Sequence, residues 1–217
     1  MDNQAHPNIE QRGFSADVEQ RHTGNVLEVR AMDNGKKKIR GYALTWNERY
    51  NMGWFTEEID RQALEGADMT DVRALLNHDA NIVLGRTAAG TLQLSTDEKG
   101  LAYEIELPDT QAARDLAVSI ERGDISQSSW GFMLRSDAES NGDEWRKENG
   151  KEHRVIKRVG RVFDVSPVTF PANPSTSVAK RSFEAIQAES EALQAKEEIF
   201  NQRSAQVRAM LAQYPNK

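Results

Sequence analysis

Short stretches of β-type pattern fill residues 25–169 and alternate with turn residues. Side chains point to opposite faces along a strand, so alternating apolar and polar residues over about four to eight positions indicate half-buried strands. The motif Asp33-Asn34-Gly35 predicts a hairpin turn between the first two stretches. Stretches with this alternation, or with a continuous apolar run, are 25–31, 39–46, 54–59, 71–79, 82–86, 91–96, 101–107, 155–159 and 162–169.

One segment in this series changes to helical spacing. We expect a helix from Asp109 or Thr110 to Arg122, with Asp109 as its N-cap and Gly123 at its end. This helix leads directly into the strand that contains Ser129. Its apolar residues recur every three or four positions, at Ala113, Leu116, Ala117 and Ile120.

Two further segments are strongly polar. Residues 136–151 are charged and contain glycine, which predicts an exposed loop. Residues 176–213 contain neither Gly nor Pro and are rich in strong helix formers, which predicts a long helix. One seam of this helix is apolar at every seventh residue, so we expect it to pack on its own domain or on a partner. The seam consists of Ile186, Leu193, Phe200, Val207 and Tyr214.

Together these elements predict a β-rich α+β fold. About seven to eight strands would form a closed or partly open β-barrel with flanking helices, and the long C-terminal helix would follow it. We expect three parts, a flexible N-terminal arm over residues 1–22, a globular domain over 23–175 and a helical C-terminal extension over 176–217.

The composition excludes several kinds of site and partner. The chain has 217 residues, a formal net charge of -6 and no cysteine. Without cysteine there are no disulfides, cysteine nucleophiles or thiolate metal sites. The negative charge argues against a nucleic-acid partner. We also expect no membrane partner and no secretory signal, because the sequence has no apolar run of bilayer length and no signal-like start.

Ser129 is the first candidate for chemistry. Trp130, Phe132 and Leu134 share one face of its strand, so Ser129 and Gly131 lie on the other. One interpretation is a nucleophile on the outer face of the fold, where Gly131 leaves the backbone open to an extended substrate. The alternative is an ordinary surface serine in a half-buried strand.

His78 is the histidine best placed to act as a base. It ends a buried strand, which would hold its backbone rigid while the imidazole reaches a neighbouring strand. The alternative is a hydrogen-bonded histidine that only caps the strand. We expect His6 and His22 to lie in the N-terminal arm and His153 to be solvated at the edge of a charged loop.

Asp164 is the third candidate, because a carboxylate in an apolar strand normally has a partner. That partner is either an arginine (Arg86, Arg158 or Arg161) or the N–H of a histidine. The second option completes a set of nucleophile, base and orienting carboxylate, which is recognised by geometry rather than chain order. Backbone N–H groups near Gly131, or Arg86, are candidates for an oxyanion hole.

Cofactor and metal chemistry find little support in the sequence. His78 and Asp79 could contribute to a divalent-ion site, but no clustered ligand spacing accompanies them. The stretch Gly85–Gly90 lacks the lysine of a phosphate-binding loop. We therefore expect no cofactor and no metal.

Four blocks of the sequence resemble the prohead (procapsid) maturation proteases of tailed bacteriophages, a serine peptidase family related in fold to the herpesvirus assemblins. The resemblance covers about residues 25–178, and makes 23–175 the protease domain. In order, the blocks are Ile39-Arg40-Gly41-Tyr42-Ala43 with Trp54-Phe55-Thr56-Glu57-Glu58-Ile59; Leu75-Leu76-Asn77-His78-Asp79 with Leu84-Gly85-Arg86-Thr87; Gly123-Asp124-Ile125 through Ser129-Trp130-Gly131-Phe132; and Asp164 through Asn173.

The resemblance implies that Ser129 is the nucleophile, in preference to Ser126 and Ser128, and that His78 is the general base. Asp164 would be the third member, although this family often has Glu at that position. The assemblins use a second histidine instead, a role that His153 fits poorly. The segment Asp60–Leu64 also departs from the family pattern, which affects the expected loop shape but not the chemistry.

The function implied is that of a serine endopeptidase in the host cytoplasm, inside the assembling procapsid. Its partners would be the major capsid protein with its scaffold segment and the protease itself, through autoprocessing or as a homo-oligomer. The alternative is a non-catalytic assembly or scaffolding protein that acts through its C-terminal helix.

Overall fold

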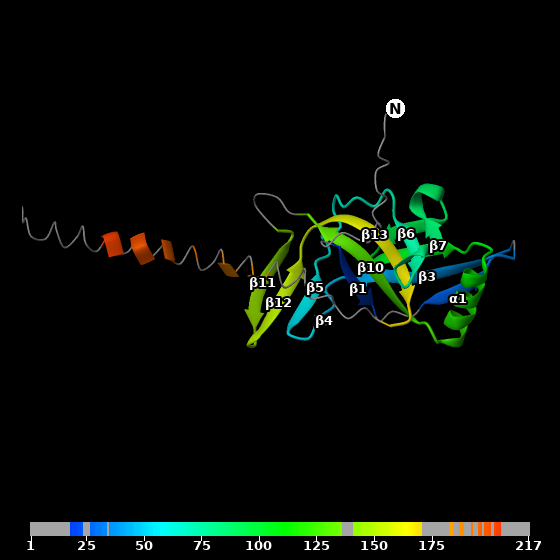
Figure 1. Ribbon diagram of the computed structural model, residues 1–217, viewed down its shortest axis with the longest axis horizontal. Helices are drawn as coiled ribbons and strands as arrows, with labels where there is room; N and C mark the ends of the chain where they lie inside the picture. The colour runs from blue at the N-terminus through cyan, green and yellow to red at the C-terminus, as the bar shows by residue number, and fades with distance from the viewer. Residues whose placement is uncertain are drawn as a thin grey trace, which may run out of the picture. The chain divides into compact units, whose positions relative to one another are not determined.

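The computed structural model describes residues 18–23, 27–33, 35–135 and 141–170, and scattered positions between 183 and 204. The chain divides into two compact units, Met1–Ser175 and Thr176–Lys217, and all of the strands belong to the first (Figure 1). The strands are β1 (Glu19–Thr23), β2 (Glu28–Ala31), β3 (Lys37–Thr45), β4 (Tyr50–Asn51), β5 (Phe55–Ile59), β6 (Arg73–Leu76), β7 (Asp79–Arg86), β8 (Leu92–Thr96), β9 (Gly100–Glu106), β10 (Gln127–Leu134), β11 (Asp143–Glu148), β12 (Lys151–Ile156) and β13 (Val159–Val168).

These strands form three sheets. A five-stranded sheet has the order β1-β10-β13-β6-β7, and two four-stranded sheets have the orders β11-β12-β5-β4 and β2-β3-β9-β8. The prediction of a β-rich fold is confirmed, but the predicted barrel is wrong. Within the described residues each sheet ends in two edge strands, so none closes on itself. Alternation along a strand shows which face is buried but not which strand lies beside it, and closure depends on that pairing.

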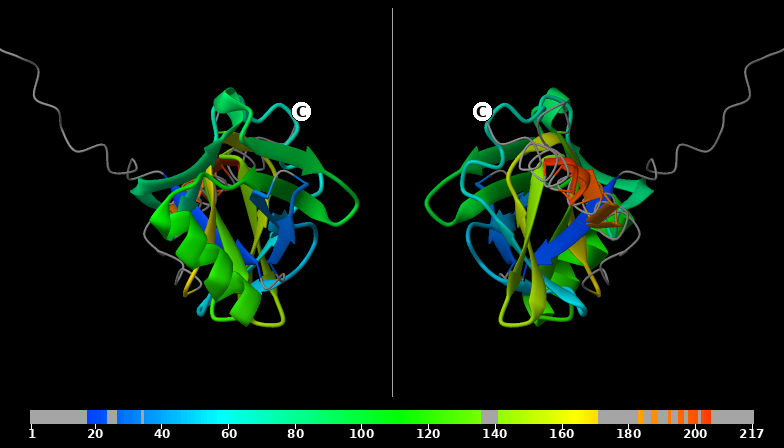
Figure 2. Two further views of the ribbon diagram at one scale, coloured as in Figure 1. Left: turned by 90° about the vertical axis from the view of Figure 1, so that its right-hand side faces the viewer. Right: turned by 90° about the vertical axis from the view of Figure 1, so that its left-hand side faces the viewer.

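Among the described residues, one apolar core is shared by the three sheets and the helix. Figure 2 shows the strands and the helix α1 in two further views. It includes Ile39 of β3, Ile156 of β12 and, from β10, Trp130 and Phe132. The rings of Trp130 and Phe132 stack with their centroids 3.9 Å apart. The aromatic face of β10 therefore faces the core, as the alternation predicts.

The helix α1 (Gln111–Arg122) follows the predicted boundaries closely, but its N-cap is Thr110 rather than Asp109. The Thr110 hydroxyl accepts a hydrogen bond from the N–H of Ala113, whereas Asp109 forms an ion pair with Arg114. At the other end Gly123 adopts a left-handed conformation with φ of 83°, which glycine adopts without steric cost. The helix buries the predicted face, Ala113, Leu116, Ala117 and Ile120.

β1 corrects the prediction of an arm over residues 1–22. Residues 19–22 lie in a strand that pairs antiparallel with β10, while residues 1–17 lie outside the described part of the chain. Glu19 and Arg21 alternate with Gln20, and both are buried. A segment that appears uniformly polar in the sequence can pair as a strand when buried partners receive its charges.

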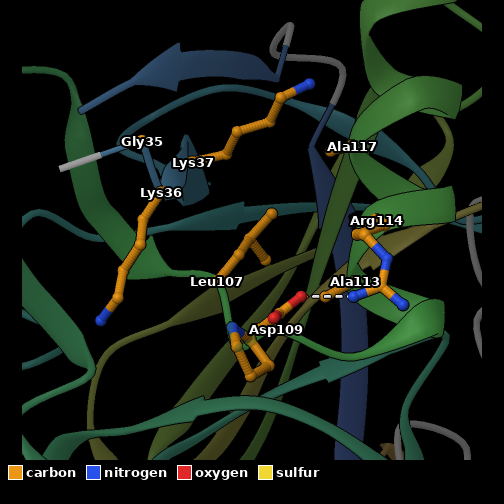
Figure 3. Close-up of a pocket in the computed structure, with 9 residues that line it drawn as sticks. Gly35, Lys36, Lys37, Leu107, Asp109, Ala113, Arg114 and Ala117 are labelled. Atoms are coloured by element: carbon orange, nitrogen blue, oxygen red, sulfur yellow. Dashed lines mark hydrogen bonds and ion pairs between the residues drawn. The ribbon is translucent and has the colours of Figure 1, made fainter. Parts of the chain in front are cut away.

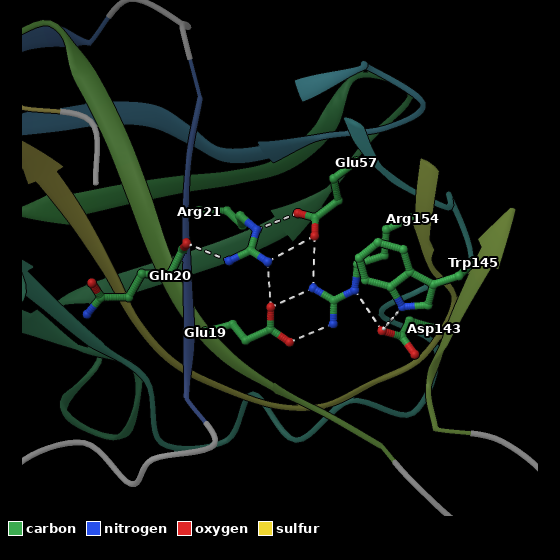
Figure 4. Close-up of polar contacts among 7 residues, drawn as sticks. All are labelled: Glu19, Gln20, Arg21, Glu57, Asp143, Trp145 and Arg154. Atoms are coloured by element: carbon green, nitrogen blue, oxygen red, sulfur yellow. Dashed lines mark hydrogen bonds and ion pairs between the residues drawn. The ribbon is translucent and has the colours of Figure 1, made fainter. Parts of the chain in front are cut away.

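Those partners form a buried ion network that joins β1 to β5, β11 and β12 (Figure 4). Arg154 donates to Glu19 at 2.6 and 2.8 Å, to Glu57 at 2.9 Å and to Asp143 at 2.6 Å. Arg21 pairs with both Glu19 and Glu57. Burial alone raises the pKa of Glu19, but the hydrogen bonds and charges of Arg154 and Arg21 outweigh it and lower that pKa to about 2.

The prediction of a loop over residues 136–151 is wrong for residues 143–148, which form β11, and for residue 151, where β12 begins. β11 and β12 form a hairpin whose two turn residues, Asn149 and Gly150, have φ values of 50° and 80°. Both angles lie in the left-handed region that Asn and Gly tolerate best. Residues 136–140 lie outside the described residues.

The predicted long C-terminal helix is not shown. Between residues 183 and 204 the described positions occur in short helical runs, and the rest of 176–217 lies outside the described residues. In the described part of the chain, no helix is long and apolar enough to cross a membrane.

Candidate active site

Ser129 lies near the middle of β10, which is paired with β1 on one edge and β13 on the other. Across the β10–β13 ladder, Ser129 is opposite Ser166 and Gly131 is opposite Asp164. Residues directly opposite each other share a face of the sheet, so these four positions lie together on the face away from Trp130. The sheet topology thus brings Ser129 and Asp164 close although they are 35 positions apart in the sequence.

His78 lies in the tight turn between β6 and β7, rather than within a strand. Asn77 and His78 have φ values of 53° and 58°, the left-handed conformation of both central residues in a type I′ turn. The N–H of Asn77 donates to the Pro167 carbonyl at 3.0 Å. Its side chain accepts from the Thr169 N–H at 2.8 Å and donates to the Thr169 hydroxyl at 3.2 Å. Asn77 therefore fastens the turn to the end of β13.

The three predicted residues meet through the imidazole of His78. Its Nδ1 lies 2.6 Å from Oδ2 of Asp164, and its Nε2 lies 2.6 Å from Oγ of Ser129. A carboxylate can only accept, so Nδ1 carries the proton and Nε2 of the neutral ring accepts the Ser129 O–H. This is the geometry in which an imidazole can remove a hydroxyl proton while a carboxylate stabilises the resulting imidazolium.

The site is enclosed rather than on an outer face. Ser129 is 0% exposed, Asp164 is 1% exposed, and the side chain of His78 is 9% exposed. The interpretation of Ser129 as an ordinary surface serine is therefore wrong. The prediction that Ser129 lies on the outer face of the fold is wrong as well. The alternation assigned the residues of β10 to its two faces correctly. It could not show that both faces are buried by other parts of the chain.

Gly131 has a different role from the one expected. A Cβ atom at this position would lie 2.3 Å from Oδ1 of Asp164, far inside van der Waals contact. Glycine here leaves room for the carboxylate rather than for a substrate. The N–H groups of β10 lie in the plane of a sheet paired on both edges, so they point toward β1 and β13.

Asp164 accepts from His78 and Ser166, and among the described residues its hydrogen-bond partners include no arginine. Arg86 instead forms a two-bond ion pair with Asp71, at 2.6 and 2.9 Å. The histidine option for the partner of Asp164 is thus the one observed. Sequence reasoning missed the contact of Ser166, although its place on the same face as Asp164 could be read from the alternation.

The other three histidines are His6, His22 and His153. His153 is fully buried, not solvated, and its Nδ1 lies 2.7 Å from the Thr56 hydroxyl in the sheet β11-β12-β5-β4. His22 pairs with Ser129 through the backbone ladder of β1 and β10, and His6 lies outside the described residues. Across the described part of the chain, no group of three or more His, Cys, Asp or Glu side chains is placed to hold a metal ion.

A cavity of about 630 Å³ lies between the β2–β3 turn and α1 (Figure 3). Its lining includes Lys36, Leu107, Arg114 and Ala117, and the Asp109–Arg114 ion pair lies along its edge. None of the three clustered residues lines it. The cavity is therefore separate from the candidate site.

Comparison with protein families gives one decisive finding. The model of the caudovirus prohead serine proteases matches residues 25–189. The chain belongs to this family. His78, Ser129 and Asp164 all lie within the part shared with the prohead serine proteases, whereas β1 lies ahead of it.

A solved structure, the bacteriophage T4 capsid assembly protease gp21, is similar to this member of the prohead protease family. It is 12% identical, with a TM-score of 0.49, and the match covers 71% of this chain and 98% of that chain. The curated proteins contain no match to the chain.

Proposed function

We propose that the protein is a serine endopeptidase that cleaves scaffold segments from the capsid protein, and cleaves itself, during maturation of the procapsid. Membership of the prohead serine protease family supports the reaction class and the setting. The observation that carries the proposal is the imidazole of His78, which contacts both Ser129 and Asp164 at 2.6 Å.

The reaction follows an acyl-enzyme route. Ser129 Oγ attacks the carbonyl carbon of the scissile peptide bond while Nε2 of His78 takes the hydroxyl proton. His78 then gives that proton to the leaving amine, and the acyl group remains on Ser129. A water molecule, activated by the same imidazole, hydrolyses the ester. General-base assistance of this kind contributes roughly 10²- to 10⁴-fold to the rate.

Asp164 fixes the imidazole in the reactive tautomer. Its Oδ2 accepts a hydrogen bond from the Nδ1–H group, which keeps the proton on Nδ1 and leaves Nε2 unprotonated and directed at Ser129. The negative charge also stabilises the imidazolium formed in each transition state. Aspartate can fill a position that is often glutamate in the family because β6 and β13 are direct neighbours, so a short side chain reaches His78.

Because the site is enclosed, it must open before a peptide substrate can bind. Ser129 is 0% exposed, so a peptide reaches its hydroxyl only after neighbouring segments move. A conformational step of this kind would restrict cleavage to the assembling particle, inside the host cytoplasm. Movement of loops over an active site is a step of this kind in many enzymes.

The test is to co-express the full chain with its capsid precursor and to sequence the new protein termini. Wild type is expected to generate defined termini in the precursor, and Ser129→Ala is expected to generate none. Ser126→Ala, at a half-buried serine three positions away, serves as the matched control and should process normally, because Nε2 of His78 is bonded to Ser129. Processing by Ser129→Ala at the wild-type rate would contradict the proposal. Absence of new termini with every variant, together with normal particle assembly, would favour the scaffolding alternative.

A further inference from the structure

The carboxylate of Asp164 is held asymmetrically. Its Oδ2 accepts two hydrogen bonds of 2.6 Å, one from Nδ1 of His78 and one from the hydroxyl of Ser166. Its Oδ1 is buried and has no hydrogen-bond partner among the residues that the structure describes. Both hydrogen bonds therefore go to the same oxygen, Oδ2. The hydroxyl of Ser166 binds the oxygen that also faces His78.

The β-sheet accounts for the position of Ser166. It lies two residues after Asp164 on β13, hence on the same face, and it is opposite Ser129 across the ladder. Ser166 is 0% exposed, so bulk water does not compete for this hydrogen bond. A hydroxyl that donates to a buried carboxylate forms a charge-assisted bond, stronger than a neutral one.

We propose that Ser166 is a positioning residue that keeps Oδ2 of Asp164 directed at Nδ1 of His78. The inference rests on the proposed roles of these two residues. Without the Ser166 donor, the bond from His78 is the one hydrogen bond to the carboxylate that remains among the described residues, so rotation about the Cβ–Cγ bond of Asp164 is less restricted. A rotating carboxylate no longer fixes the plane of the imidazole, and Nε2 then points at Ser129 for only part of the time.

The test uses the full-length chain with Ser166→Ala and two readouts. The first is the rate at which a fluorophosphonate probe labels Ser129 in particles assembled with the capsid precursor, a rate that depends on the imidazole. The second is the NMR resonance of the Nδ1 proton of His78, assigned with a His78→Gln variant. We expect labelling to slow roughly tenfold, the scale of one hydrogen bond to a charged group, and the proton resonance to move and broaden. Ser166→Thr retains the hydroxyl and should restore most of both.

Ser128→Ala is the matched control. Ser128 is a fully buried serine next to Ser129, and its hydroxyl lies 2.7 Å from the Tyr103 hydroxyl on the core face. Its removal deletes one buried hydrogen bond without touching Asp164. A general loss of stability would affect both alanine variants alike, whereas a positioning role predicts changes in Ser166→Ala alone.

The outcomes separate this inference from the proposed function. Wild-type labelling rate and an unmoved Nδ1 resonance in Ser166→Ala would overturn the role of Ser166. Failure of wild type to label at Ser129 would count against the proposed function, while the resonance comparison would still decide the role of Ser166. If Ser166→Ala does not fold, Ser166→Cys, of similar size and with only a weak donor, is compared with Ser166→Thr in the same two measurements.

Discussion

At the scale of single residues, the absence of one Cβ atom decides where the carboxylate of Asp164 can lie. Gly131 is directly opposite Asp164 in the ladder, and Oδ1 occupies the space that a side chain at 131 would fill. The Ser-x-Gly-Phe spacing around Ser129 therefore has a steric reason. The strand that carries Ser129 must also make room for the carboxylate of Asp164.

Gly131→Ala is expected to disable the site. Its Cβ would lie 2.3 Å from Oδ1 of Asp164, so the carboxylate must move away from His78. We expect fluorophosphonate labelling of Ser129 to be lost and the free energy of unfolding to fall by about 1–3 kcal/mol, measured by urea denaturation. Gly160→Ala on β13 is the control, because its nearest neighbour would lie at 3.3 Å and its cost should be smaller. Unchanged labelling in Gly131→Ala would show that the carboxylate is not confined as described.

The sequence predicted the strand faces and partners of Ser129 and Asp164 better than it predicted what surrounds them. Alternation placed Ser129 on the other face of β10 from Trp130. The isolated charge of Asp164 predicted a partner, and the structure shows that partner to be His78. The sequence could not indicate that Ser129 is enclosed, because burial of that face depends on segments remote in the sequence. Nor could it choose between arginine and histidine as the partner, since that depends on β6 lying beside β13.

At the scale of elements, β1 shows how charge can hold a strand in place. Glu19 and Arg21 would each be costly to bury alone, but Arg154 and Glu57 neutralise them across the boundary between two sheets. Removing one partner from such a network leaves a buried charge without its counterion. The stability of the β1 contact should therefore depend on the ionisation of Glu19.

Glu19→Gln gives a prediction with a definite pH dependence. The pKa of Glu19 is lowered in the folded protein from 4.5 to about 2, so its carboxylate stabilises the fold above pH 4.5 and this contribution disappears as the pH falls toward 2. We expect wild type to exceed Glu19→Gln in free energy of unfolding by up to about 3 kcal/mol near neutral pH. The difference should shrink between pH 4.5 and pH 2 in urea denaturation. A difference that stays constant over that range would contradict the role of the ionised carboxylate.

The hairpin of β11 and β12 illustrates what periodicity misses. Charged residues on these strands obscured the alternation, and the segment was predicted to be a loop. The dipeptide Asn149-Gly150 was the available signal, since both residues have the positive φ that a two-residue hairpin turn requires. By contrast, α1 was predicted nearly to the residue, because helical spacing and capping are local properties of the chain.

At the scale of the whole molecule, the site exists because three distant segments meet in one sheet. β13 lies between β10 and β6, antiparallel to one and parallel to the other. The parallel contact in turn places the β6–β7 turn, and with it His78, at the end of β13. No local pattern records these pairings, which explains why most of the strands could be predicted while their closure into a barrel was wrong.

The central claim is that Ser129 is a nucleophile activated by His78, and mass spectrometry of the fluorophosphonate-treated protein tests it most directly. The full-length chain is assembled with its capsid precursor, treated with the probe and digested, and the modified peptide is identified. The account predicts an adduct on Ser129 in wild type and its loss in His78→Ala. An absent adduct in assembled particles, or equal modification of Ser129 without His78, would contradict it.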